Sequence, residues 1–510
     1  MALFRKGKEK VLFVATEAAP FAKAGGLGEV MFALPRLLRK LGYDARVMVP
    51  RYASVNSEET ELTVEKEGLR VPTNGEGASD EEIQELICNV KVYTPKGEKR
   101  TPVITYFLEN EEYFEKRSNI YGYNDDAIRW ALLSRGVLEF LRTSEWIPDV
   151  IVAADWQLGF LCNYLKTTYR DDSVLKNIAT VFTIHNLRHQ GMFDQHFVSE
   201  MDFDDGQAGL PSFFDERLLK INGMRRGILH ADVISTVSPQ YAREIMTEEY
   251  GELLDGLLRE RRSRVYGILN GIDHDELNPE TDTYLFENYK KTSLDVRVKN
   301  KRELQSRFGL DEDAKTFLIA IVSRLSEQKG FDLMLPVADV LLRELNIQCA
   351  VLGSGDGRYM SFFQELEKNY PGRVGINLTF DPVLNHVVFG GADAVLIPSR
   401  FEPSGIVQLE AMRYGAIPIV RKTGGLANTV EDYNPEKETG IGFVFNEFDA
   451  QAMMIAITRS FVNYRNKPVW RAIQKRAMEA DFSWTASAKE YIHLFGVAIA
   501  FRKRELSEEE

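Results

Sequence analysis

Two cations set five residues apart are the first candidates for chemistry in this sequence. Arg324 and Lys329 follow an apolar run at residues 317–322 and precede a helical pattern. Positive charges at the end of a buried strand are poorly placed for a solvated face, and this spacing suits a clamp on a diphosphate. The alternative is a pair of surface salt bridges, which contribute little to stability.

The turn around Glu402 is the second candidate. It joins a buried run ending at Pro398 to a helical pattern at residues 405–414. Pro403 suits a rigid turn, and the N–H groups of Gly405 and Ile406 open the helix toward a phosphate. A lone glutamate here would be a helix cap, but in this setting the sequence favours a carboxylate that faces a bound sugar.

A near-repeat of five residues supplies two further loops. Residues 23–27 (KAGGL) and 422–426 (KTGGL) each follow a strand and precede a helix. Glycines let the backbone approach a ligand, and free N–H groups at a helix start favour anions, to which Lys23 adds a full charge. A tight turn without a ligand is the alternative. The match can arise by chance, and it is also suggestive of two related folds.

Two polar residues end strands at the sheet edge where α/β proteins bind ligands. His185 closes the run at residues 179–184, and an isolated histidine there is as often structural as functional. Asp155 closes the run at residues 150–153 and is a helix cap by default. The glycine-rich turn at residues 353–357 (GSGDG) is a weak signal by itself.

Short apolar strands alternate with amphipathic helices and position these residues. Helical periodicity is clearest at residues 30–41, 128–141, 405–414 and 450–464. Strands buried on both faces and separated by helices indicate doubly wound, parallel α/β sheets. Strands are predicted at residues 11–16, 45–49, 103–107, 150–153, 179–184, 233–237, 265–269, 317–322, 348–352, 374–379, 394–398, 417–420 and 442–445.

The strand–helix rhythm pauses in a polar segment around residues 279–300, so each side holds enough strands for its own sheet. The length of 510 residues also exceeds one ordinary domain. Residues 61–97 alternate polar and apolar side chains and are predicted to form a hairpin excursion. Residues 505–510 form an acidic tail.

Composition limits the classes of partner. With 63 Lys+Arg against 76 Asp+Glu, the formal net charge is −13. This balance is that of a globular protein and argues against a nucleic-acid partner, which needs a basic stripe. A small anionic ligand still fits, because a local basic pocket can lie within an acidic surface.

Cysteines and apolar runs indicate a chain without disulfides, zinc or membrane spans. Cys88, Cys162 and Cys349 lie far apart, with no CxxC spacing, and the histidines include no HExxH. The apolar run that begins at Val11 is too short for a signal peptide, and no run is long enough to cross a bilayer. We expect a cytoplasmic protein that binds no metal.

Taken together, these motifs resemble the glycogen and starch synthases, retaining glucosyltransferases of the GT-B fold. The likeness runs from about residue 11 to residue 484. It implies two Rossmann-like, doubly wound parallel-sheet domains facing across a cleft. We expect an acceptor-binding domain at residues 1–285, a nucleotide-sugar-binding domain at 286–482, and a C-terminal helix at 483–510 that crosses back to the first domain.

The resemblance implies a role for each matching residue. Arg324 and Lys329 neutralise the departing diphosphate, Glu402 holds the donor glucose, and His185 and Asp155 orient it. The remaining implied contacts to the nucleotide sugar come from residues spread over both halves of the chain: Lys23, Gly25, Gly26, Asn270, Gly353, Phe380, Ser404, Gly405, Ile406 and Thr423.

The implied reaction moves glucose from ADP-glucose to the non-reducing 4-hydroxyl of an α-1,4-glucan such as glycogen or a maltooligosaccharide, with retention. It requires no cofactor. The alternatives are a transferase that uses UDP-glucose, and a glucan-binding relative with weak catalysis. Several positions depart from the family pattern: Ala154 replaces a histidine, Glu29 an aspartate, Phe380 a tyrosine, and Ser404 a cysteine common in bacterial members.

Overall fold

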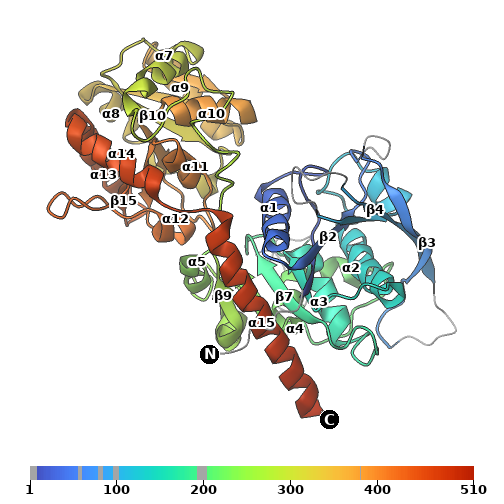
Figure 1. Cartoon of the computed structure of the whole chain (residues 1–510). Helices are drawn as coiled ribbons and strands as arrows, with labels where there is room; N and C mark the ends of the chain where they lie inside the picture. The colour runs from blue at the N-terminus through green and yellow to red at the C-terminus, as the bar shows by residue number, and fades with distance from the viewer. Residues whose placement is uncertain are drawn as a thin grey trace. The chain divides into compact units, whose positions relative to one another are not determined.

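The structure, a computed structural model, describes residues 9–55, 60–77, 84–95, 103–191, 204–379 and 381–509. Contacts divide the chain into two compact units. Unit 1 comprises Met1–Val237, Ala242–Ile268 and Ser487–Glu510, and unit 2 comprises Ser238–Tyr241 and Leu269–Ala486. In Figure 1 the first unit runs from blue to green and ends with red helix α15, whereas the second runs mainly from yellow to orange-red.

Unit 1 is built on one sheet, which has nine strands in the described ranges, in the order β3-β4-β5-β2-β1-β6-β7-β8-β9. Strands β5 to β9, with β2 and β1, pair in parallel, whereas β3 and β4 form an antiparallel hairpin at one edge. This confirms the hairpin predicted for residues 61–97. The strands are β1 (Lys10–Val14), β2 (Asp44–Pro50), β3 (Thr63–Pro72), β4 (Glu85–Tyr93), β5 (Thr105–Glu109), β6 (Val150–Ala154), β7 (Ala179–Ile184), β8 (Val233–Thr236) and β9 (Val265–Gly267).

Unit 2 is built on a parallel sheet, which has six strands in the part of the chain that the structure describes, in the order β12-β11-β10-β13-β14-β15. Every one of the thirteen strands predicted from the sequence has a counterpart in the two sheets, so the α/β prediction is confirmed. The strands are β10 (Phe317–Val322), β11 (Ile347–Leu352), β12 (Val374–Asn377), β13 (Ala394–Ile397), β14 (Ile417–Arg421) and β15 (Phe443–Phe445).

Helices connect the parallel strands, as such crossovers require. In unit 1 they are α1 (Gly26–Lys40), α2 (Asp126–Thr143), α3 (Gly159–Lys166), α4 (Gly223–His230) and α6 (Asp255–Glu260). In unit 2 they are α7 (Arg297–Arg307), α8 (Ala338–Glu344), α9 (Gly357–Asn369), α10 (Pro382–Gly391), α11 (Val407–Arg413), α12 (Gly424–Thr429), α13 (Ala450–Arg465) and α14 (Lys467–Glu479). Two helices, α5 (Pro239–Glu244) and α15 (Trp484–Glu509), carry residues of both units.

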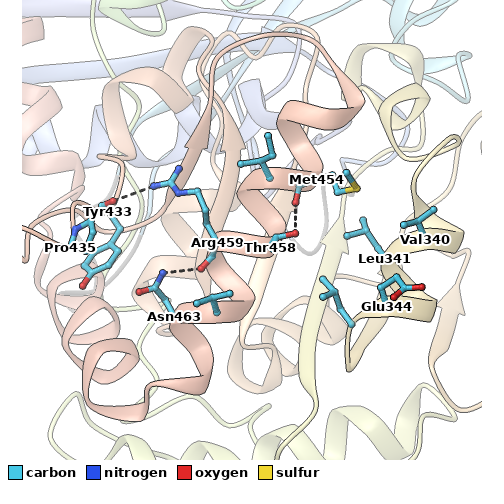
Figure 2. A pocket seen from close by; sticks show the side chains of 12 residues that line it. Val340, Leu341, Glu344, Tyr433, Pro435, Met454, Thr458, Arg459 and Asn463 are labelled. Carbon is cyan, nitrogen blue, oxygen red and sulfur yellow. Dashed lines mark hydrogen bonds between the residues drawn. The ribbon is translucent and has the colours of Figure 1, made fainter.

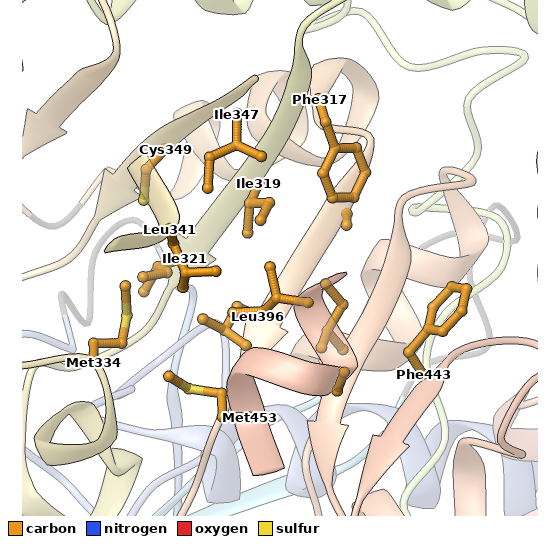
Figure 3. Packing of buried hydrophobic residues seen from close by; sticks show 14 of the residues in the cluster. Phe317, Ile319, Ile321, Met334, Leu341, Ile347, Cys349, Leu396, Phe443 and Met453 are labelled. Atoms are coloured by element: carbon orange, nitrogen blue, oxygen red, sulfur yellow. The ribbon is translucent and has the colours of Figure 1, made fainter. Parts of the chain in front are cut away.

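Alternate side chains of strand β10 show why this sheet forms in the interior. Phe317, Ile319 and Ile321 pack into one apolar core, where Leu396 and Met453 meet them from β13 and α13 (Figure 3). The intervening residues 318, 320 and 322 belong to a second apolar core. Because both faces bury apolar surface, the strand is a continuous apolar run, which is the pattern of a parallel sheet.

The unit boundaries lie elsewhere than the sequence analysis placed them. The first falls between Ile268 and Leu269, not at 285/286, because the segment after Leu269 bonds within unit 2: the Tyr289 hydroxyl donates to the Tyr414 carbonyl at 2.7 Å. The second falls between Ala486 and Ser487, not at 482/483. Near it, the Ile272 N–H donates to the Phe482 carbonyl at 2.9 Å, a bond that ties the segment before residue 487 to unit 2.

Most of helix α15 packs on unit 1. The Phe495 ring meets Phe13 of the central strand β1 edge-on, with centroids 6.4 Å apart. Near the end of the helix, Arg502 donates to the Lys176 carbonyl at 2.7 Å, and Glu505 pairs with Lys166 at 2.5 Å. The C-terminal segment is therefore part of the first unit's core.

Candidate active site

Strand order places the first group of candidate residues at one edge of the second sheet. The chain passes from β10 through β11 to β12 on one side, then returns to β13 on the other side of β10. Helices leave opposite faces at such a reversal, so a crevice opens beyond the carboxyl ends of the two central strands. Residues 323–330 follow β10 and residues 398–405 follow β13, which makes these segments neighbours.

Lys329 and Glu402 meet there, although 73 residues separate them in the sequence. The Lys329 ammonium donates to Glu402 Oε2 at 2.6 Å, and the Ser399 hydroxyl donates to the same oxygen at 2.8 Å. Glu402 is only 7% exposed. This is not the surface salt bridge considered as an alternative for Lys329, because both ends of the pair are largely removed from water.

Backbone contact at Gly330 holds the two segments together. Gly330 has φ +73°, and a Cβ there would lie 2.0 Å from the Pro398 carbonyl oxygen. Beside it, Arg400 N–H donates to the Gln328 carbonyl at 2.9 Å. Only glycine permits both this conformation and this approach, so the glycine after Lys329 is what brings its segment against the Glu402 turn.

The two glycines of the 422–426 loop pack against the backbone of the Glu402 turn. A Cβ at Gly425 would lie 1.5 Å from the Ser404 carbonyl oxygen, and one at Gly424 would lie 1.9 Å from the Glu402 carbonyl oxygen. Gly425 N–H donates to that Glu402 carbonyl at 2.9 Å. Thr423, the residue before helix α12, is 1% exposed. In this unit the motif therefore contacts the protein's own backbone.

Arg324 lies on the same edge with its guanidinium exposed. It forms no ion pair with any residue in the described ranges. Its segment rests on the glycine-rich turn: a Cβ at Gly353 would lie 1.8 Å from the Ser323 carbonyl oxygen, and Leu325 N–H donates to the Ser354 carbonyl at 2.8 Å. Gly353 thus has a packing role beneath a cation that is free to meet an anion.

Five more predicted positions belong to unit 2. Gly405 has φ +66°, and Ile406 precedes the first turn of helix α11. The Ser404 hydroxyl is buried without a hydrogen-bond partner among the described residues, and the same holds for Asn270 Oδ1. Because a buried polar atom without a partner is costly, both groups are candidates for contact with a ligand. Phe380 lies outside the described residues.

The second group of candidates lies at the corresponding reversal of the first sheet, between β1 and β6. Asp155 follows β6 with φ +58° and ψ −177°, a conformation that costs a residue with a side chain about 1–3 kcal/mol. Its carboxylate does not cap the following turn. Instead, Asp155 Oδ1 accepts the backbone N–H of His185 at 2.8 Å. Such strain gathers at functional sites.

The chemistry of the Asp155 carboxyl differs from that of an exposed aspartate. Burial raises its pKa, and the neighbouring His185 ring opposes that rise. His185 Nε2 is buried and has no hydrogen-bond partner within the part of the chain that the structure describes. The bond from its backbone N–H to Asp155 holds His185 at the end of β7, and Nε2 stays available to a ligand hydroxyl.

The Lys23 loop shows a feature that sequence reasoning missed. The Lys23 ammonium pairs with Glu29, and both side chains are about half exposed. The N–H groups of Ala24 and Gly25 donate to the carboxylate of Glu17, at 2.6 and 2.8 Å. Gly26 opens helix α1. Of the two glycines predicted to bind an anion through the backbone, Gly25 already holds one, the Glu17 carboxylate. Only the position of Glu17 just after a strand could have signalled it.

A larger hollow in unit 2, between helices α8 and α13, contains none of the candidate residues (Figure 2). Val340, Leu341 and Met454 line it, and three of its polar side chains donate to nearby backbone carbonyls, among them Arg459, which donates to the Tyr433 carbonyl at 3.2 Å. It lacks the convergent charges that a nucleotide sugar needs. Among the described residues, we find no cluster of three or more histidine, cysteine or carboxylate groups placed to hold a metal, and no helix able to span a membrane.

Comparison with known proteins identifies the family. Residues 10–260 match the family model for the starch synthase catalytic domain, and residues 302–469 match glycosyl transferases group 1. Glycogen synthase from Geobacillus stearothermophilus is 42% identical over 486 residues, which cover 94% of this chain and 96% of the relative. The chain belongs to the glycogen synthase family. It is accordingly a glycosyltransferase of the GT-B fold, as the motifs predict.

Other members and structures agree with this assignment. Glycogen synthase from Thermotoga maritima is 40% identical, covering 96% of this chain and 99% of the relative. The catalytic domain of starch synthase IV from Arabidopsis thaliana, solved with ADP and acarbose, superposes with a TM-score of 0.81 at 30% identity, covering 97% of this chain and all of that one. Sucrose-phosphate synthase from Thermosynechococcus elongatus, at 16% identity and a TM-score of 0.56, shares the fold.

Proposed function

We propose that this member of the glycogen synthase family transfers glucose from ADP-glucose to the non-reducing 4-hydroxyl of an α-1,4-glucan, with retention at C1. The observation that carries the proposal is the largely buried Lys329–Glu402 pair at the strand reversal, together with the unpaired Arg324 on the segment that follows the same strand as Lys329. The choice of donor follows the related Arabidopsis starch synthase, whose structure was solved with ADP.

Lys329 and Arg324 have the charge and position to stabilise a departing diphosphate. An ammonium carries three N–H donors, so the bond to Glu402 leaves two for phosphate oxygens. Arg324 contributes a planar fork that suits the second phosphate. As the C1–O bond to the diphosphate breaks, negative charge grows on those oxygens, and preorganised cations lower the barrier most where charge develops.

Glu402 has a binding role in this mechanism. One oxygen is held by Lys329 and Ser399, so the carboxylate is fixed and its other oxygen can accept a glucose hydroxyl. In unit 1, His185 Nε2 has no partner in the described part of the chain and can bond a sugar hydroxyl, with Asp155 holding the histidine backbone in place. Ser404 and Asn270 offer further unpaired groups to the donor.

Retention follows if the acceptor attacks from the face that the diphosphate leaves. The C1–O bond to the diphosphate breaks as the bond from C1 to the acceptor oxygen forms. The proton of that hydroxyl passes to an oxygen of the leaving phosphate, so no protein nucleophile is needed. We also propose that Arg324 and Lys329 supply the charge a divalent metal would otherwise bring, and chelation should leave the rate within twofold.

The experiment measures glucose transfer to glycogen with ADP-glucose and UDP-glucose in parallel. We expect kcat/KM at least tenfold higher with ADP-glucose, and nuclear magnetic resonance of the product should show a new α-linkage. A preference for UDP-glucose would replace the donor assignment. Glycogen binding without release of any nucleotide would identify the weak, glucan-binding relative that the Ala154 departure suggests.

A further inference from the structure

Glu17 is a buried carboxylate to which neither the sequence motifs nor the proposed mechanism gives a role. It lies three residues after strand β1 and is 3% exposed. Leaving a carboxylate buried without partners is very costly, so such a group persists only where it is hydrogen-bonded. Its partners therefore show what it does.

Those partners come from two separate segments. Glu17 Oε2 accepts the N–H groups of Ala24 and Gly25, and Glu17 Oε1 accepts the Tyr121 hydroxyl at 3.1 Å. The Tyr121 oxygen also lies 2.7 Å from the Thr16 hydroxyl. Burial, followed by the Glu17 charge, raises the pKa of Tyr121 far above its ordinary value, so the hydroxyl keeps its proton and donates. Glu17 thus ties the Lys23 loop to the end of β1.

This arrangement changes how the loop can meet a diphosphate. A phosphate placed on the Ala24 and Gly25 amides would have to displace the Glu17 carboxylate or lie against it, and two anions at that distance repel. Lys23 is different, because its ion pair with Glu29 is half exposed and an exposed pair is weak. The ammonium can therefore move to a phosphate while the loop backbone stays in place.

Gly28 shows that the loop is built around the carboxylate. A Cβ at Gly28 would lie 3.2 Å from Glu17 Oε2 and 3.2 Å from Lys23 Cγ. Both distances are tighter than ordinary van der Waals contact, so a side chain there would displace the carboxylate or the lysine stem. The absence of a side chain at position 28 lets Glu17 and Lys23 lie side by side over the first turn of α1.

We propose that Glu17 is the positioning residue that holds loop 23–28 in the shape that presents Lys23 to the donor diphosphate. The amides of Ala24 and Gly25 serve the carboxylate and not the phosphate. This inference rests on the proposed function, since it assumes that the diphosphate of the nucleotide sugar meets Lys23.

The test compares Glu17→Ala, Glu17→Gln and Gly28→Ala in the full-length enzyme. Glu139→Ala is the matched control, because Glu139 is also a buried carboxylate of unit 1 and accepts a tyrosine hydroxyl, from Tyr169. The readouts are KM for ADP-glucose and for glycogen, kcat, the melting temperature, and the exchange rate of the backbone amides at residues 24 and 25.

For Glu17→Ala we expect amide exchange at least tenfold faster at residues 24 and 25 and KM for ADP-glucose raised at least tenfold. KM for glycogen should stay within twofold. Glu17→Gln, which keeps an acceptor for both amides, should restore each value to within threefold of wild type. Gly28→Ala should raise KM for ADP-glucose at least fivefold without lowering the melting temperature, since alanine favours a helix. Glu139→Ala should lower the melting temperature and leave both KM values unchanged.

Two results would overturn the inference: KM for ADP-glucose within twofold of wild type in Gly28→Ala, or equal rises in both KM values in Glu17→Ala. If Glu17→Ala does not fold, the Gly28→Ala and Glu17→Gln comparison decides. Failure of the proposed donor is distinguishable, because wild-type enzyme would then not use ADP-glucose. In that case the same KM comparison is made with UDP-glucose, and the amide exchange is unaffected by the choice of donor.

Discussion

Replacing Lys329 by methionine removes the ammonium of the buried pair and keeps most of the side-chain stem. Glu402, which is 7% exposed, then keeps the hydrogen bond that the Ser399 hydroxyl donates to its carboxylate at 2.8 Å, but it loses its positive partner. Removing one member of a buried pair costs about 3–5 kcal/mol. For a domain of this size each kcal/mol shifts the midpoint by about 2–4 °C, so the unfolding transition of unit 2 should fall by roughly 6–20 °C.

Turnover should fall for a separate reason. The ammonium contacts the leaving diphosphate in the proposed mechanism, and loss of such a charge-assisted contact reduces the rate at least ~100-fold, or about 2.7 kcal/mol of transition-state stabilisation. A single variant cannot distinguish this loss from partial unfolding. The second partner of the pair supplies the distinction.

In the double variant Lys329→Met with Glu402→Gln, neither buried charge remains. Stability should recover by at least about 2 kcal/mol relative to the sum of the single changes, because the uncompensated charge is gone. Turnover should remain at least ~100-fold below wild type. Lys291→Met is the control: Lys291 pairs with Glu479 at 2.9 Å in the same unit, but both side chains are about half exposed, so stability should change by less than about 0.5 kcal/mol.

The assays are thermal unfolding by calorimetry and steady-state glucose transfer at 25 °C, below every expected transition. Recovery of turnover to within threefold of wild type in the double variant, together with its stability, would refute a chemical role for Lys329. The residue would then be purely structural.

Three further predictions concern other sites. The hydrogen bond that the His386 ring donates to Asp282 raises the pKa of His386, so this pair stabilises unit 2 fully below about pH 6.5 and less as pH rises through the folded value. The unfolding free energy measured from pH 6 to 9 should fall, and Asp282→Asn should flatten the curve. Gly425→Ala places a Cβ 1.5 Å from the Ser404 carbonyl oxygen and should destabilise unit 2 by about 3 kcal/mol or more in denaturant melts. Gly496→Ala is the control: the space around its Cβ is open, so it should stabilise helix α15 by up to about 1 kcal/mol. His185→Phe should lower turnover at least ~10-fold, because it removes a buried ring nitrogen, Nε2, that has no partner in the described part of the chain. Normal turnover would exclude His185 from the donor site.

The positions of the parallel strands are predictable because a strand that is buried on both faces appears in the sequence as a short, continuous apolar run. The meeting of Lys329 with Glu402 was within reach of the same reasoning. Each follows a central strand, and the strand order makes those strands neighbours. The pairing itself was not predictable, since the sequence indicates which edge a side chain lies on and not which partner it selects.

Glu17 escaped prediction for a physical reason. It is one of 76 acidic residues, and its partners are backbone N–H groups, which leave no trace in residue types. The glycines at residues 424 and 425 belong to a strand–glycine–helix pattern that favours an anion or, alternatively, a tight turn without a ligand. In the structure its glycines serve a close approach of two backbones, and sequence alone does not separate that use from ligand binding.

The segment Ser487–Glu510, most of helix α15, belongs to unit 1. The core of that unit is therefore incomplete when its strands leave the ribosome. About 220 residues must be synthesised between Ile268 and Ser487, which takes roughly 10–45 s at cellular elongation rates. During that interval Phe495 does not yet cover the apolar surface around Phe13. The nascent chain is therefore expected to require chaperone protection of its first half, and a stop codon just before residue 487 should yield aggregated protein although every strand of both sheets is present.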